Sequence, residues 1–230
     1  VHDSLFRNNV VDNFEADGGQ TSRGGGLYVS NSEAIVDHSA FVGNAASKGG
    51  GVGAYSTFPF NRGKIAITNS TLSRNFCGQS GCGFDSFDVD VTLAYDTIVD
   101  NQMASVPTGP VGPRQGPGLN IAQSVPSLSK RINVFGSIIA RNKKDFMAST
   151  DPSDGQSWDC SVMVDPGLTI VGASNNFIGS GGQDCILLGA PAGDPLIGEG
   201  RPAGGSNPDD PVLDPGLAKL PESPLSCPSS

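Results

Sequence analysis

The sequence is poor in histidine, in basic residues and in long apolar runs. Only two histidines are present, and acidic residues (23) outnumber Lys and Arg (14), which gives a formal net charge of −9. Nucleic acids and anionic membranes are bound through dense Lys and Arg, so we expect neither as a main partner. No stretch of 18 residues is continuously apolar, and we therefore expect no membrane-spanning segment.

Long helices are also unexpected from the composition. Gly (32) and Pro (17) make up about a fifth of the 230 residues, well above the ~12% of ordinary proteins, and helices tolerate neither residue well. Val, Ile, Leu and Phe are nevertheless spread evenly, which is not typical of a disordered chain. Five cysteines favour an oxidising, extracellular compartment over the cytosol. The chain starts at Val1 rather than Met, which we interpret as a mature product or a fragment.

One short motif recurs along the first 142 residues. It reads Ser-x-Φ-x-x-Asn, where Φ is apolar, and one copy has Asp in place of Ser. The copies begin and end at Ser4/Asn9, Ser39/Asn44, Ser70/Asn75, Asp96/Asn101 and Ser137/Asn142. An aliphatic residue lies three positions before each Ser or Asp, at Val1, Val36, Ile67, Leu93 and Val134. The Φ positions are Phe6, Phe41, Leu72, Ile98 and Ile139.

A second motif, Gly-x-Gly-Φ, lies between the copies of the first. It ends at the apolar residues Leu27, Val52, Phe84 and Leu119. Successive Asn residues of the first motif are 35, 31, 26 and 41 residues apart. A core unit of about 25 residues that takes inserts at only two places explains this spacing, because loops tolerate inserts.

These motifs predict an all-β fold built as a parallel β-solenoid. No stretch shows the 3.6-residue period of a helical repeat. In a solenoid each coil pairs with its neighbours, so equivalent side chains stack ~4.8 Å apart and the two apolar columns face inward. The Asn column (Asn9, Asn44, Asn75, Asn101 and Asn142) is predicted at a corner, where each amide bonds corner backbone and the next Asn. We interpret this column as structural rather than ligand-binding.

Residues 1–142 carry two motifs in register that resemble the Gly-Gly-x-Φ and Phe-x-x-Asn repeats of polymorphic outer-membrane proteins and related autotransporter passengers. These are bacterial surface proteins with a right-handed parallel β-helix. The later stretches "SNNFIGS" and "DPVLDPGLAKLPESPLSC" look like the C-terminal part of secreted bacterial β-helix proteins with a choice-of-anchor ending, although no such anchor is evident after residue 187. The resemblance implies a β-helix of about five to six coils over residues 1–186. Residues 187–230 are expected to form an irregular Pro/Gly-rich cap or wrap.

The cysteines predict disulfides rather than a metal site. Cys77 and Cys82 are close enough in sequence to staple one loop. Cys160 and Cys185 are about one coil apart, which is inside disulfide range if coils stack. Cys227 is left over. The spacing matches no zinc pattern, and histidine is scarce.

The segment "FDSFDVDV" is the candidate for chemistry. Asp88 and Asp90 alternate with valines and so are predicted to face outward, with Asp85 nearby. A Ca²⁺ site or an acid/base pair is one hypothesis, and a solvated strand face is the favoured one. His2 and His38 do not occupy the same position of the repeat, which argues against a catalytic histidine.

Fold alone does not define function, since this architecture carries adhesins, lyases, hydrolases and inert spacers. Our first hypothesis is a secreted or cell-surface structural or adhesive protein without catalysis or cofactor. The alternative is a carbohydrate-active enzyme, either a polysaccharide lyase or a glycoside hydrolase. Expected partners are a carbohydrate or a host or cell-surface ligand. Self-association is expected through the open edge at residues 1–9, because an unpaired strand edge is a template for another β-chain.

Overall fold

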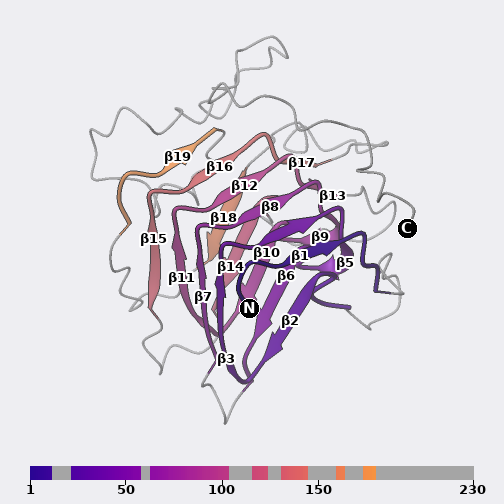
Figure 1. Ribbon diagram of the computed structural model, residues 1–230, viewed down its shortest axis with the longest axis horizontal. Helices are drawn as coiled ribbons and strands as arrows, with labels where there is room; N and C mark the ends of the chain where they lie inside the picture. The colour runs from indigo at the N-terminus through magenta and orange to yellow at the C-terminus, as the bar shows by residue number, and fades with distance from the viewer. Residues whose placement is uncertain are drawn as a thin grey trace.

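The computed structural model describes residues 1–11, 22–57, 63–103, 116–123, 131–144, 159–163 and 173–179. Within these ranges the protein is all-β, and its regular elements are short strands that pair only in parallel (Figure 1). The same ranges contain nothing helical that could cross a bilayer. The expected all-β class is therefore confirmed.

The strands form four sheets. Sheet A contains β3 (Glu33–Asp37), β7 (Lys64–Thr68), β11 (Asp90–Ala94) and β15 (Ile132–Phe135). Sheet B contains β1 (Leu5–Arg7), β4 (Ala40–Val42), β8 (Thr71–Ser73), β12 (Thr97–Val99), β16 (Ile138–Ala140) and β19 (Phe177–Ile178). Sheet C contains β5 (Ala45–Lys48), β9 (Phe76–Ser80), β13 (Gln102–Met103) and β17 (Lys143–Lys144). Sheet D contains β2 (Leu27–Ser30), β6 (Val52–Tyr55), β10 (Phe84–Phe87), β14 (Leu119–Ala122) and β18 (Cys160–Met163).

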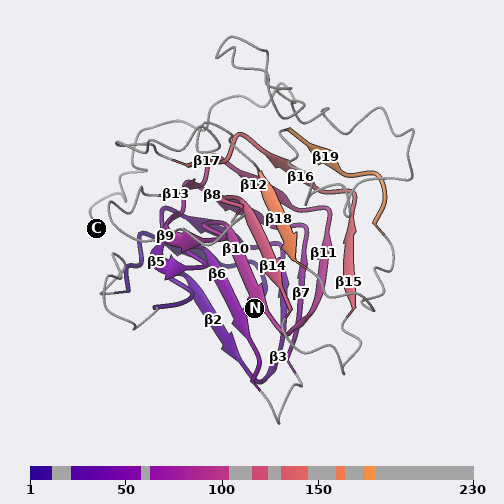
Figure 2. The same ribbon diagram turned by 180° about the vertical axis from the view of Figure 1, so that it is seen from behind.

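The chain visits the sheets in a fixed order. From β2 it runs through sheets D, A, B and C and returns to D at β6, and the same order repeats up to β18. We call each such passage a circuit. Every strand pairs with the equivalent strand of the next circuit, and the two views show the colour advancing from indigo at one end of each sheet toward orange at the other (Figures 1 and 2). Residues that are equivalent in the repeat thus become neighbours.

The register of the strands confirms most of the predicted apolar columns. Val36, Ile67, Leu93 and Val134 are partners across sheet A, and all are buried. In sheet B the column runs through Phe41, Leu72, Ile98 and Ile139 to Ile178, again with every side chain buried. Phe6 is half-buried, and its ring stacks on that of Phe41 at 4.7 Å. Val1, at the end of the sheet A column, is the exception: its backbone pairs with Ile35 and Asp37, but the residue is 50% exposed rather than interior.

The corners between sheets use left-handed backbone. Between sheets A and B the residue before each Ser of the repeat has φ between 46° and 60°, at Asp3, His38, Asn69, Tyr95, Gly136 and Asn175. Between sheets B and C the same conformation precedes each Asn of the column, at Asn8, Gly43, Arg74, Asp100 and Arg141. Left-handed backbone is adopted most readily by Gly, Asn, Asp and His, which explains why polar residues collect on these corners.

A further circuit follows β17, and its corner residues differ from those of the five motif copies. Asn176 is the residue at the Ser position, and Ile178 is at the Φ position. Ser174 forms an isolated bridge to Phe135, at the end of sheet A. Residues 180–230, which include the expected cap and the domain boundary at 186/187, lie outside the described ranges.

Candidate functional site

The Asn column forms a continuous hydrogen-bonded ladder. Asn75 Oδ1 accepts hydrogen bonds from the backbone N–H of Asn44 at 3.0 Å and from its Nδ2 at 3.1 Å. Asn75 in turn donates from its backbone N–H and its Nδ2 to Asn101 Oδ1, at 3.0 and 2.9 Å. The second Nδ2 hydrogen reaches the carbonyl oxygen of Phe41 at 3.0 Å. The buried amides of Asn44, Asn75, Asn101 and Asn142 are thus satisfied by corner backbone and by the neighbouring residues of the column, as the sequence predicted. Asn9 is exposed, and its backbone N–H and Nδ2 donate to Asn44 Oδ1.

The ladder explains why the Gly-x-Gly-Φ motif occurs together with the Ser-x-Φ-x-x-Asn motif. A Cβ atom placed on Gly51 would lie 2.9 Å from Asn75 Nδ2, and one placed on Gly83 would lie 2.9 Å from Asn101 Nδ2. The second Gly of Gly-x-Gly-Φ is therefore required by close packing against the Asn amide. At the far end, Asp159 Oδ1 accepts both the backbone N–H and the Nδ2 hydrogen of Asn142, at 2.7 and 2.8 Å. Sequence reasoning missed Asp159, which lies 17 residues beyond the last Asn of the repeat.

The Ser position of the repeat forms a second ladder. Ser70 Oγ accepts the backbone N–H of Ser39 at 3.0 Å and donates to the carbonyl oxygen of Thr68 at 2.8 Å. In the next circuit Asp96 replaces Ser, and its carboxylate accepts the N–H groups of Ser70 and Ala94 at 2.9 and 3.0 Å. Burial raises the pKa of Asp96 to about 8, and the two backbone hydrogen bonds oppose this rise. The Asp96 carboxyl therefore has a structural role, because it binds backbone N–H groups at this corner.

Asp85 is enclosed within a polar network. Its Oδ1 accepts hydrogen bonds from Ser80 Oγ at 2.7 Å and from Asn120 Nδ2 at 2.8 Å, and the residue is buried. Burial raises the pKa of Asp85, against the effect of the hydrogen bonds from Ser80 and Asn120. The side chain thus joins strand β10 to strand β14 and to the end of strand β9.

The prediction that Asp88 and Asp90 both face outward is wrong for Asp88. Asp88 is buried and has φ of 55°, because it forms the corner between sheets D and A and the strand alternation stops there. Asp90 is half-buried at the start of β11, where it is the register partner of Lys64 and its Oδ1 accepts the backbone N–H of Arg131 at 2.9 Å. Asp85 and Asp90 therefore contact different partners, and Asp85, Asp88 and Asp90 are not among the groups of potential metal ligands in the described ranges. The acid/base hypothesis stays a prediction.

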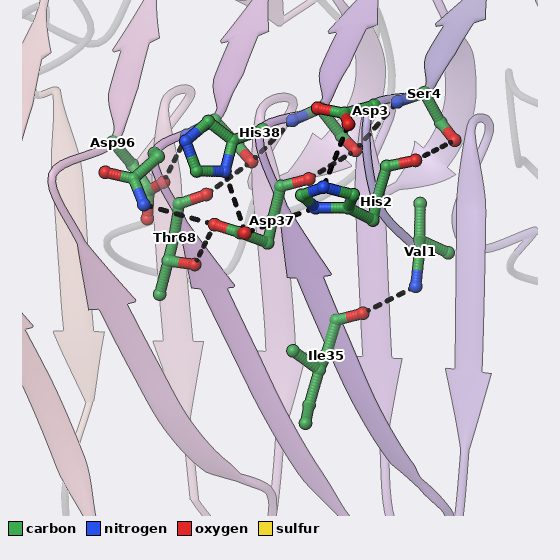
Figure 3. Close-up of polar contacts among 12 residues, drawn as sticks. Val1, His2, Asp3, Ser4, Ile35, Asp37, His38, Thr68 and Asp96 are labelled. Atoms are coloured by element: carbon green, nitrogen blue, oxygen red, sulfur yellow. Dashed lines mark hydrogen bonds and ion pairs between the residues drawn. The ribbon is translucent and has the colours of Figure 1, made fainter.

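The described side chains that could jointly hold a metal ion lie elsewhere, at the corner between sheets A and B. His2, Asp37 and His38 are the one group of three potential ligands found in the described ranges, and their ligand atoms all lie within 4.8 Å of one another. We call this group the His–Asp cluster. His38 Nδ1 lies 2.7 Å from Asp37 Oδ2, and His2 Nδ1 lies 3.2 Å from the same oxygen (Figure 3).

The next circuit along the chain holds the central carboxylate of this cluster. Thr68 Oγ1 and Asn69 Nδ2 donate to Asp37 Oδ1 at 2.6 and 3.1 Å. Hydrogen bonds from Thr68, Asn69 and His38 hold the pKa of Asp37 well below its ordinary value. Asp37 is therefore a carboxylate over the whole physiological range, with one oxygen facing two imidazoles.

Sequence reasoning dismissed these histidines because they lie at different positions of the repeat. His2 is two residues before its Ser, whereas His38 is one residue before its own. The bridge between His2 and Asp37 shows that adjacent positions of stacked corners come close together. A search for polar residues within two positions of the Ser column, over neighbouring copies, would have found the cluster.

The Cys77–Cys82 disulfide is present, as predicted, with its Cα atoms 4.8 Å apart. Both cysteines are buried beside Met103 in a small apolar cluster separate from the main core. Cys160 is also disulfide-bonded. Cys185 and Cys227 lie outside the described residues, so the Cys160–Cys185 pair stays a prediction.

Comparison of the chain with known protein families, curated proteins and solved structures returned no match.

Proposed function

We propose that the chain forms a right-handed parallel β-helix that serves as a structural or adhesive scaffold at a cell surface or outside the cell, without catalysis. Two observations support the fold part of this proposal. The chain repeats the sheet order D, A, B, C over successive circuits, and equivalent residues are partners in every sheet. The Asn and Ser ladders give each circuit the same corner chemistry.

One observation carries the non-catalytic part of the proposal. The carboxylates of the candidate segment and its neighbours hold the scaffold together: Asp85 joins β10 to β14, Asp90 binds the backbone of Arg131, and Asp96 binds two backbone N–H groups. Asp100 pairs with Arg141 of the next circuit at 2.8 Å. Acid/base catalysis on a sugar needs two carboxyl groups facing one bond, and these four face four different partners.

The outer face of sheet D supports the adhesive part. Tyr55 and Phe87 are register partners whose rings stack at 5.2 Å, and the Arg23 guanidinium lies 4.0 Å from the Tyr55 ring centre. Tyr28, on the neighbouring strand β2, is 46% exposed. Aromatic rings beside a cation offer both apolar and polar contacts to a carbohydrate or a protein ligand. The disulfides at Cys77–Cys82 and Cys160 support an oxidising compartment.

Two measurements on one preparation test this function. The protein is incubated with pectin, alginate and glucan, and reducing ends are measured; we expect none. Binding to the same polysaccharides and to whole cells is then measured for wild type and for Tyr28→Ala. We expect Tyr28→Ala to weaken binding and Tyr95→Ala, which removes an exposed ring from the corner between sheets A and B, to leave it unchanged. Released sugar ends would contradict the proposal, as would equal binding by all three proteins.

The alternative function is a carbohydrate-active enzyme that uses carboxyl groups of the segment "FDSFDVDV". If a degradation product forms, Asp90→Asn decides its origin, because Asp90 is the half-buried carboxylate of that segment. Loss of product in that variant, with Glu33→Gln still active, favours the enzyme. Self-association through the edge of β1 also stays a prediction, which sedimentation at several protein concentrations tests.

A further inference from the structure

The fold brings both histidines of the chain to one carboxylate oxygen. They are the only two in 230 residues, and they lie 36 positions apart. In the structure both Nδ1 atoms lie within 3.2 Å of Asp37 Oδ2, and the two rings are 5.6 Å apart, edge to face (Figure 3). Two nitrogen atoms and one oxygen thus converge from two adjacent circuits.

The atoms around this point are oriented by further hydrogen bonds. Asp37 Oδ1 is held by Thr68 and Asn69, which leaves Oδ2 for the imidazoles. On the other side, His2 Nε2 lies 2.8 Å from Asp3 Oδ2. An imidazole that donates its Nε2 proton to a carboxylate presents its Nδ1 lone pair on the opposite side of the ring, which is how metal-ligating histidines are usually held.

The central oxygen carries a negative charge that a cation would balance. Asp37 Oδ2 faces both imidazole Nδ1 atoms, 3.2 Å from that of His2 and 2.7 Å from that of His38. A metal ion bound among these three atoms would take the place of the protons on the two Nδ1 atoms, as metal binding to histidine requires, and the Asp37 carboxylate would attract it.

We propose that His2, Asp37 and His38 bind a first-row transition-metal ion of the Zn²⁺ class, through His2 Nδ1, His38 Nδ1 and Asp37 Oδ2. Zn²⁺ is commonly bound by His nitrogen and Asp oxygen, with three protein ligands and one position left to water or to another donor. Side chains that are 63% (His2) and 57% (His38) exposed leave that fourth position on the solvent side. Ca²⁺ and Mg²⁺ prefer all-oxygen ligand sets, so this cluster selects against both.

The backbone conformation itself places the three side chains of the His–Asp cluster close together. His38 occupies a left-handed corner with φ of 46°, and the bridge between His2 and Asp37 sets the two circuits in register. A bound ion would therefore connect the segment before β1 to the corner after β3 and would leave the strands where they are. This role goes beyond the proposed scaffold function and does not depend on it.

Calorimetric titration of the full chain with ZnCl₂, after treatment with a chelator, tests the proposal. We expect one Zn²⁺ per chain and no heat of binding with CaCl₂. His38→Asn removes the imidazole but keeps a residue suited to the left-handed corner, and Asp37→Asn removes the carboxylate charge. Each is expected to weaken Zn²⁺ binding by at least about 100-fold, and Asp3→Asn by roughly 10-fold, the usual effect of a residue that orients a ligand.

Glu33→Gln is the matched control for the loss of one exposed carboxylate, since Glu33 lies on the same strand as Asp37 and pairs with Lys64. It should bind Zn²⁺ as the wild type does. Imidazole ¹⁵N spectra provide an independent readout, because the chain has only two histidines, and Zn²⁺ should shift the Nδ1 resonance of both. No binding by the wild type, or unchanged binding by a folded His38→Asn variant, would overturn the proposal. Circular dichroism and the melting temperature without Zn²⁺ establish that each variant is folded.

Discussion

Asp96 occupies a position at which the neighbouring circuits carry Ser70 and Ser137. Burial raises its pKa from 3.8 to about 8 in the folded protein. A carboxyl with a raised pKa stabilises the fold in its protonated form, so its contribution is complete below pH 4 and is lost as the pH rises toward 8. The residue therefore makes the protein less stable in mildly alkaline solution.

We expect Asp96→Ser to raise the free energy of unfolding by roughly 2–4 kcal/mol at pH 8.5. Four pKa units correspond to ~5–6 kcal/mol, and Ser keeps only one of the two backbone hydrogen bonds. At pH 4 the variant should be no more stable than the wild type. Urea denaturation at both pH values measures this, with Asp90→Ser as a control at a half-buried Asp. An equal gain at both pH values would show that titration of Asp96 is not the cause.

Substitution of Asn75 tests how much the Asn ladder contributes to stability. Asn75→Ala removes the acceptor of two N–H donors of Asn44 and leaves the backbone N–H group of Asn44 buried without a partner. We expect a loss of roughly 1–3 kcal/mol, measured from the denaturation midpoint. Asn133, which is half-buried on the outer side of β15, is the matched control, and Asn133→Ala should cost less than about 0.5 kcal/mol. Equal losses in the two variants would argue against a special role for the ladder.

At the scale of elements, the strands and the corner with the Asn column could be predicted, and the arrangement of the other corners could not. The Ser-x-Φ pattern fixed β4, β8, β12 and β16 in register, because a one-residue slip would expose Phe41 and its partners. Corner backbone interrupts the alternation, and residues as different as His38 and Tyr95 share the same conformation there. This is why Asp88 was placed outside when it is buried.

The candidate metal ligands were missed for the same reason. Motif alignment compares equal positions of the repeat, whereas His2 meets Asp37 across neighbouring corners and His38 follows Asp37 directly along the chain. Asp159 was missed because a 17-residue separation from Asn142, with no Gly-x-Gly motif between them, hides the next circuit. Sequence periodicity reveals residues that recur at the same position of successive motif copies. A residue that is present in one copy alone gives no periodic signal.

The Cys77–Cys82 disulfide closes a short loop that begins in β9. Its removal should therefore destabilise this loop more than the main core. Replacing both Cys77 and Cys82 by Ala opens a short loop and should lower the free energy of unfolding by ~2 kcal/mol, from the closure entropy of about six residues. Denaturation by urea under non-reducing conditions measures the loss. Because Cys77 and Cys82 belong to a small apolar cluster with Met103, which is separate from the main core in the described part of the chain, the far-UV spectrum should be unchanged. A globally altered spectrum in the double variant would contradict this.

At the scale of the whole molecule, each circuit contacts mainly the circuits before and after it, so stability should spread from neighbour to neighbour. Leu72 lies in the middle of the sheet B column, between Phe41 and Ile98. Leu72→Ala opens a cavity there and should cost roughly 2–5 kcal/mol. Thr71→Ala, at the adjacent position that faces the other way, is the matched control.

Hydrogen exchange of the backbone amides shows which strands lose stability in Leu72→Ala. In Leu72→Ala we expect protection to fall first in β8 and in its two partners, β4 and β12, while β16 keeps its protection until more denaturant is added. In Thr71→Ala all four strands should exchange nearly as in the wild type. If every strand of sheet B instead loses protection together in Leu72→Ala, the circuits unfold as a single cooperative unit, and the nearest-neighbour description is wrong for this protein. A graded response would mean that the stacked columns, rather than one global core, set the stability of each circuit.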